Sequence, residues 1–90
     1  MNRQYKLFTN CPDLASVIIP GSVNSIGNYA FFSCSSLNSI TCRAITPPSG
    51  GWYIFENTNN CPIYVPAGSV IAYQEAEYWQ SYASRIRAIP

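Results

Sequence analysis

Residues 11–31 read CPDLASVIIPGSVNSIGNYAF, and part of this pattern returns along the chain at a spacing of 23 residues. A second step of the same length carries the apolar strand pattern to Ile63 and Val65. A unit of this length cannot bury its own apolar face, whereas stacked copies share a continuous core. The repeat therefore predicts a solenoid. The positions that match in the first step are Phe8 with Phe31, Cys11 with Cys34, Leu14 with Leu37, Ser16 with Ser39 and Val17 with Ile40.

Each unit is predicted to begin with a short strand that ends at a turn. Val17 and Ile19 are apolar at alternate positions, which is the period of a half-buried strand. Residues 20–21 (PG) follow the first strand, and residues 66–68 (PAG) follow the third. Proline cannot donate to a strand ladder and glycine tolerates the positive φ of a sharp turn, so these residues are expected to end the strands.

The rest of the first unit carries a second, shorter pattern. Residues 23–27 read VNSIG and show another apolar alternation, which predicts a second short strand. Residues 28–32 are predicted to form one helical turn that points Phe31 into the core. In the next unit, residues 46–51 read TPPSGG in place of a regular turn, so a regular second strand is not assured there.

Residues 11–31 closely resemble the BspA-like class of leucine-rich repeats, which reads as cysteine, leucine, an I-x-I-P strand, S-V-x-x-I-G and A-F before the next cysteine. Residues 61–73, CPIYVPAGSVIAY, look like the closing element of such proteins. The resemblance implies a leucine-rich-repeat solenoid of short strands and short helical turns, of the right-handed β/α superhelix type. The implied division is one domain over residues 1–90, with repeats at about 8–30 and 31–54 and a closing strand and helical cap over 55–90.

The same resemblance implies an exported bacterial protein that is attached to the cell surface and acts in adhesion. A protein or a glycan is the implied ligand, and no cofactor is expected. The main alternative is purely structural, with the segment closing a longer repeat array that binds elsewhere. A further alternative is self-association as a homo-oligomer, because the first strand edge, around Tyr5 to Phe8, has no cap of its own.

A helical cap is predicted because the last unit of a solenoid needs its apolar face covered. Ser69 is a candidate N-cap, whose hydroxyl would accept a backbone N–H of a helix from Val70 to about Glu77. Farther along, apolar residues at i, i+3, i+4 and i+7 predict one apolar helical face. These residues are Trp79, Tyr82, Ala83 and Ile86, with Trp79 covering the last unit and Arg85 and Arg87 at the solvent end.

Composition and charge argue against several classes of partner. Charged residues make up 10% of the chain and its formal net charge is +1, so nucleic acid is not an expected partner. No apolar stretch approaches the roughly 20 residues needed to cross a bilayer, so membrane insertion is not expected. Residues 1–4 are polar and no apolar core follows them, so no signal peptide is expected in this sequence.

Four cysteines occur without the spacing or the histidines of a zinc site, so no bound metal is expected. Buried thiols that fill the core are the favoured interpretation, because matching cysteines would stack in neighbouring units about 4.8 Å apart. That spacing also permits a disulfide between units. The redox state of Cys11, Cys34, Cys42 and Cys61 therefore stays open.

No catalytic residue is predicted. The sequence has no histidine, so none of the thiols has an imidazole base to activate it. Glu75 and Glu77 are two residues apart on a predicted helix, so they point away from one another and cannot share a substrate.

Residues 46–53, TPPSGGWY, interrupt the repeat and carry two aromatic residues beside glycines. Irregular loops on a rigid scaffold often bind ligands, and Trp and Tyr are enriched in binding hot spots. Trp52 and Tyr53 are therefore the candidate ligand-binding residues. The favoured competing interpretation is that one of them folds inward, because residues 54–55 follow at once and must return to the core. The other tyrosines define no coherent surface stripe in the sequence.

Overall fold

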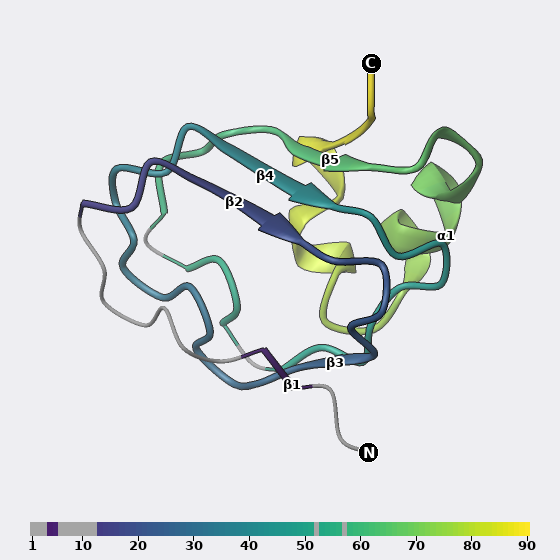
Figure 1. Ribbon diagram of the computed structural model, residues 1–90, viewed down its shortest axis with the longest axis horizontal. Coiled ribbons are helices and arrows are strands. Elements are labelled where there is room, and N and C mark those ends of the chain that lie inside the picture. The colour runs from purple at the N-terminus through teal and green to yellow at the C-terminus, as the bar shows by residue number, and fades with distance from the viewer. Residues whose placement is uncertain (1–3, 6–12, 52, 57) are drawn as a thin grey trace.

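The computed structural model describes residues 4–5, 13–51, 53–56 and 58–90. These residues form a parallel sheet of four strands that follow one another in chain order, as Figure 1 shows for β2, β4 and β5. A parallel neighbour requires the chain to return to the starting edge, so a return segment follows each of the first three strands. The strands are β2 (Ser16–Ile19), β4 (Ser39–Cys42), β5 (Ile63–Val65) and β6 (Ile86–Ala88).

The register of this sheet reproduces the 23-residue spacing of the sequence. Val17 pairs with Ile40, Ile40 with Ile63, and Ile63 with Ile86. All four side chains are buried, so one apolar ladder runs through the sheet on its inner face. We call residues 16–38, 39–62 and 63–85 units 1, 2 and 3, each being a strand with the segment that returns to the next strand.

A second line of parallel pairing lies on the opposite side of the molecule (Figure 1). There β3 (Ser25–Ile26) pairs with β1 (Gln4–Tyr5) and also, through an isolated bridge, with Ser49. The Ile26 N–H donates to the Ser49 carbonyl at 2.8 Å. The second strand predicted in the first unit is therefore confirmed, and the irregular loop of unit 2 keeps a single bridge in its place.

The corner that follows β3 is not the predicted helical turn. Residues 28–33 form successive tight turns, in which Tyr29 and Ser33 have positive φ values of 59° and 61°. A right-handed helix of L-residues cannot contain such left-handed residues, which explains the difference. The inward position predicted for Phe31 is confirmed, because its side chain is fully buried.

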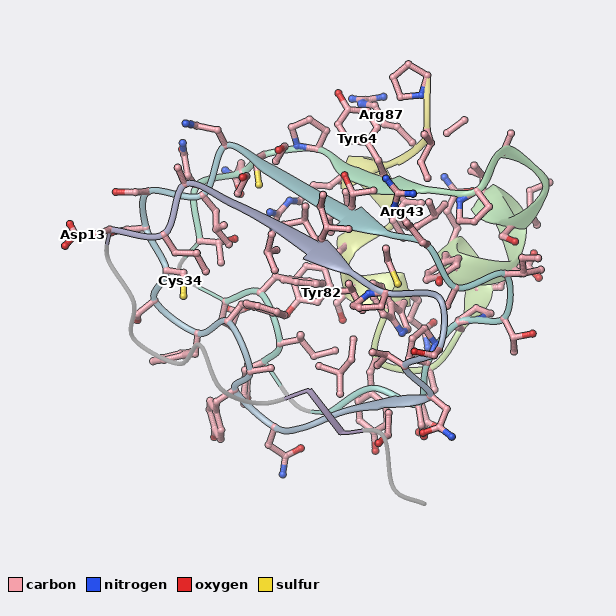
Figure 2. The ribbon with its side chains drawn as sticks, viewed as in Figure 1. Asp13, Cys34, Arg43, Tyr64, Tyr82 and Arg87 are labelled. Atoms are coloured by element: carbon pink, nitrogen blue, oxygen red, sulfur yellow. The ribbon has the colours of Figure 1, made fainter. Side chains whose placement is uncertain are left out.

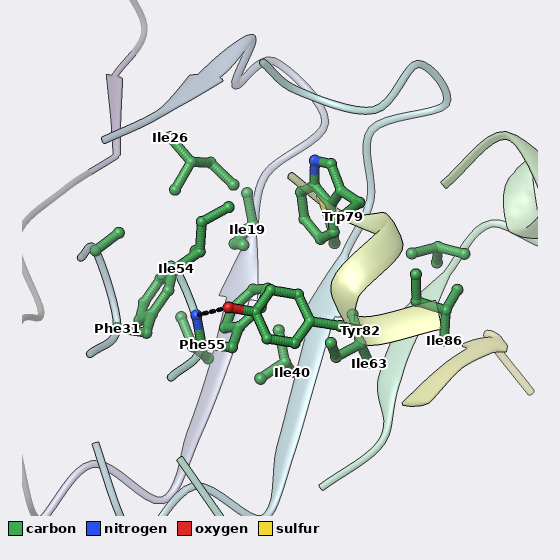
Figure 3. Packing of buried hydrophobic residues seen from close by; sticks show 14 of the residues in the cluster. Ile19, Ile26, Phe31, Ile40, Ile54, Phe55, Ile63, Trp79, Tyr82 and Ile86 are labelled. Atoms are coloured by element: carbon green, nitrogen blue, oxygen red, sulfur yellow. Dashed lines mark hydrogen bonds between the residues drawn. The ribbon is translucent and has the colours of Figure 1, made fainter. Parts of the chain in front are cut away.

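An aromatic ring from each unit fills the centre of the core (Figure 3). Phe31 stacks on Phe55 with ring centroids 5.6 Å apart, and Phe55 packs against Trp79 at 5.7 Å. Aromatic pairs of this kind contribute about 0.5–1.5 kcal/mol beyond their buried area. The Trp79 indole N–H donates to the Pro48 carbonyl at 2.9 Å, so the polar group of this buried ring is satisfied.

The closing segment differs from the predicted helical cap. After the 3-10 turn η1 (Ala67–Ser69), α1 (Val70–Glu75) ends at Glu75 instead of continuing to Glu77. A second 3-10 helix, η2 (Gln80–Arg85), then leads directly into β6. The predicted helical face over residues 79–86 is therefore wrong, because Ile86 lies in a strand. Pairing with β5 satisfies backbone hydrogen-bonding groups of residues 86–88, whereas a short helix there would be only marginally stable.

Ser69 is not the predicted helix cap. The side chain is buried, makes no capping hydrogen bond to α1, and donates from its hydroxyl to the Ile45 carbonyl at 2.6 Å. The serine instead holds the start of α1 against the segment that follows β4.

The described cysteines are buried in the core. Cys42 Sγ lies 3.2 Å from the Tyr73 hydroxyl, which donates to the Ala44 carbonyl at 2.6 Å. Burial raises the pKa of the Cys42 thiol and of the Tyr73 phenol, so both groups stay protonated at neutral pH. Cys42 and Cys61 are present as thiols, in agreement with the favoured core-filling role. Cys11 lies outside the described residues.

Candidate binding cleft

Tyr53, one of the two candidate binding residues, points outward. Its side chain is 54% exposed and its backbone is left-handed, with φ of 57°. The core positions beside it are taken by Ile54 and Phe55, which are both buried. The favoured inward interpretation is therefore wrong for Tyr53, because the two residues that follow it already fill the space. Trp52 lies outside the described residues.

Tyr53 stacks on the tyrosine at the equivalent place in unit 1. The rings of Tyr29 and Tyr53 have centroids 5.6 Å apart and planes 26° apart. Each tyrosine precedes the core phenylalanine of its unit by two residues, and their φ values are both positive, 59° for Tyr29 and 57° for Tyr53. The left-handed backbone turns the ring out of the core, so two exposed rings form one stacked pair. The sequence did not predict this pairing of Tyr29 with Tyr53.

A cleft of about 430 Å³ opens beside Tyr53, between unit 2 and unit 3. Its size falls within the range of about 300–1,000 Å³ that is usual for small-molecule sites. Unit 2 contributes the tight turn 53–56, and unit 3 contributes the segment around η2. The described residues that line the cleft are Gly51, Tyr53, Glu56, Tyr78, Ser81 and Tyr82.

The Tyr82 ring forms one wall of the cleft. Its hydroxyl accepts a hydrogen bond from the Phe55 backbone N–H at 3.3 Å, drawn as the dashed line in Figure 3. Burial is the main cause of the raised pKa of Tyr82, and the nearby Glu56 carboxylate raises it further. The hydrogen bond from Phe55 and the charge of Arg85 lower this pKa, but their effects are smaller than the rise. The phenol is therefore neutral at physiological pH and serves as a rigid, uncharged wall.

Arg85 is held at the side of Tyr82 by several contacts. Its Nε donates to the Cys61 carbonyl at 2.9 Å and its Nη2 donates to the Thr58 hydroxyl at 3.1 Å, while the guanidinium lies 5.7 Å from the Tyr82 ring centre. Arg85 does not line the cleft. Among the described lining residues, only Glu56 carries a charge at neutral pH.

The outer face of the sheet offers a second exposed surface. Ile18, Thr41, Tyr64 and Arg87 pair across the four strands in one row. Tyr64 and Arg87 lie next to one another on the outer side of the sheet (Figure 2). This row is polar except for Ile18, which is 55% exposed. It provides a flat surface, whereas the cleft beside Tyr53 provides a concave one.

Sequence reasoning found Tyr53 but missed Tyr29, Glu56 and Tyr78. A signal for Tyr29 exists in the sequence, because Tyr29 and Tyr53 both stand two residues before a core phenylalanine. The two tyrosines are 24 residues apart instead of 23, because unit 2 has one more residue than unit 1 between its strand and this corner. The residues from unit 3 could not be found, because their approach depends on how η2 packs.

The described part of the chain contains no group of three or more acidic, cysteine or histidine residues placed to hold a metal ion. In the same part of the chain, no helix has the length and apolarity needed to span a membrane.

The protein-family model of the BspA type leucine rich repeat region, which comprises six copies, matches residues 3–87. The chain matches no curated protein. The matched region contains strands β1 to β5, the first two residues of β6, and the described residues that line the cleft.

Proposed function

Since the chain belongs to the BspA-type leucine-rich repeat family, we propose that it is a non-catalytic interaction module at a bacterial cell surface. Proteins of this family are typically surface-associated and bacterial, and the repeat is generally a protein-interaction scaffold without enzymatic activity. The proposal extends these family properties to adhesion, with a protein or a glycan as the ligand.

The fold proposed with this function is a right-handed solenoid in which each unit makes one turn. It is supported by the chain order of the four parallel strands and by their constant spacing. Right-handed connections between parallel strands are strongly preferred, because a right-twisted strand packs back onto its sheet most easily in that way. A stacked scaffold of this kind is suited to binding because neighbouring units hold surface side chains at fixed separations.

The observation that carries the binding proposal is the exposed Tyr53 ring beside the cleft. A left-handed backbone is uncommon for a bulky residue and costs of order 1 kcal/mol or more. Tyr29 and Tyr53 both adopt it, and the result is a pair of exposed rings on a rigid core. Such rings offer a large contact area with few rotatable bonds, which favours binding.

The proposal is tested by retention of the purified chain on surfaces coated with mucin or with a basement-membrane extract. The wild-type chain should be retained, and Tyr53→Ala should lower retention about tenfold. Tyr64→Ala is the matched control, since it removes a tyrosine from the outer face of β5 and should leave retention unchanged. If the wild-type chain is not retained on either surface, the purely structural role as a closing element becomes the better account.

Self-association is a second candidate, favoured by the two edge strands β2 and β6 of the described sheet. Edge strands present unpaired backbone groups that can pair with another copy of the chain. Sedimentation over a hundredfold range of concentration, with and without reductant, tests this candidate. Dimers that form with concentration and resist reductant support strand pairing, whereas a monomer throughout refutes it.

A further inference from the structure

We propose that the cleft beside Tyr53 binds a neutral saccharide, with one sugar ring stacked on the face of Tyr53 that looks toward unit 3. This inference rests on the proposed binding function and names its ligand class.

The stacking leaves one face of Tyr53 directed at the cleft. Tyr29 from unit 1 covers the other face, at a centroid distance of 5.6 Å. Across the cleft stand residues of unit 3, and none of the described rings there stacks on Tyr53. The left-handed tyrosine of unit 3 is Tyr78, with φ of 72°, which stands one position before the core aromatic Trp79 instead of two. Its side chain lines the cleft without stacking on Tyr53. The tyrosine stack therefore ends at Tyr53, next to a hollow that can accept a flat ligand.

The polar groups of the cleft match the rim of a sugar ring. A pyranose has an apolar C–H face for stacking and hydroxyl groups around its edge. Ser81 and Tyr78 contribute hydroxyl groups that can donate or accept, and Glu56 contributes carboxylate oxygens that accept from sugar hydroxyls. A cleft with aromatic walls and a few polar groups is the usual composition of a small-molecule site.

The charge of the cleft favours a neutral ligand. A phosphate, a sulfate or another carboxylate would find no positive charge among the described lining residues, because Arg85 is held by Cys61 and Thr58 outside the cleft. A cation would meet a single exposed carboxylate, whose attraction is weak in water. The Arg85 guanidinium beside Tyr82 would also oppose a cation on that ring.

The test is a titration of the full chain with neutral tetrasaccharides of hexose and of N-acetylhexosamine, followed by NMR signals of the tyrosine rings. At least one neutral saccharide should bind and shift the Tyr53 ring signals. Tyr53→Ala should weaken that binding about tenfold, whereas Tyr53→Phe, which keeps the ring, should stay within about twofold. Tyr64→Ala should bind as the wild type does. Glu56→Gln keeps an acceptor and should change the affinity by less than about fivefold.

Three outcomes of the titration overturn the saccharide inference. They are the absence of binding to every neutral saccharide, binding that Tyr53→Ala leaves unchanged, and tighter binding of sulfated than of neutral saccharides. Mucin or matrix retention that depends on Tyr53 but survives enzymatic removal of glycans would retain the binding function and refute the sugar as ligand. Failure of the binding function itself is distinguishable, because retention of the wild-type chain is then absent on both coated surfaces.

Discussion

Gly51→Ala is expected to lower the free energy of unfolding by about 3 kcal/mol. A Cβ at this position would lie 2.5 Å from the backbone nitrogen and 2.7 Å from the Cα of Asn28, where ordinary contacts begin near 3.4 Å. Asn28 is the equivalent residue 23 positions earlier, so relief requires units 1 and 2 to separate locally. Overpacking of a core costs typically about 1–3 kcal/mol, and a contact with backbone atoms belongs at the upper end because no rotamer change relieves it.

The matched control is Gly68→Ala, since a Cβ there would meet nothing within 4 Å. This variant should be neutral or more stable by up to about 1 kcal/mol, because alanine lowers the entropy of the unfolded chain. Thermal unfolding followed by circular dichroism measures both. For a domain of this size, a loss of 3 kcal/mol lowers Tm by about 12–24 °C. If Gly51→Ala melts within about 3 °C of the wild type, the close approach of the two units is refuted.

Three further predictions concern the core. Ile86→Ala should cost about 2–4 kcal/mol in chemical denaturation because Ile86 is buried in β6, whereas Ile71→Ala at an exposed site should stay within about 0.5 kcal/mol. Tyr73→Phe should cost about 1–3 kcal/mol, since the Ala44 carbonyl loses its buried donor, and an unchanged melting curve would contradict that hydrogen bond. Burial raises the pKa of the Cys42 thiol above its ordinary value of 9.0. The stability that comes from the protonated thiol is therefore present below pH 9 and is lost as the pH rises beyond it. The free energy of unfolding, measured between pH 7 and 11, should decline less steeply with pH for Cys42→Ala than for the wild type.

The strand register could be predicted from the sequence because a single physical constraint sets it. Val17, Ile40 and Ile63 must all face the core, and in a strand a shift of one residue would turn each of them toward solvent. The apolar alternation and the constant spacing therefore determine the pairing, as the observed register confirms. The same spacing also reaches Ile86, which the sequence analysis assigned to a helical face.

The closing segment was harder to predict because Ile86 satisfies two patterns at once. It stands 23 residues after Ile63, and it also stands seven residues after Trp79 on an apparent helical face. Local periodicity cannot choose between a strand that gains a ladder partner and a helix that gains an apolar face. The ladder with β5 prevails because it satisfies the backbone and buries the side chain, whereas helices of fewer than about 12 residues are marginal without tertiary support.

The cleft shows which part of a site depends on backbone conformation. Hydrophobicity alone places an aromatic residue in the core, and Phe31 and Phe55 obey that expectation. Tyr29 and Tyr53 differ because a positive φ reverses the direction of their side chains, a conformation that sequence periodicity does not specify. The two tyrosines repeat the same turn in consecutive units, so their stacking follows from the repeat itself. A ligand stacked on Tyr53 would extend this series of rings by one step, into the cleft that side chains of unit 3 line without stacking on Tyr53.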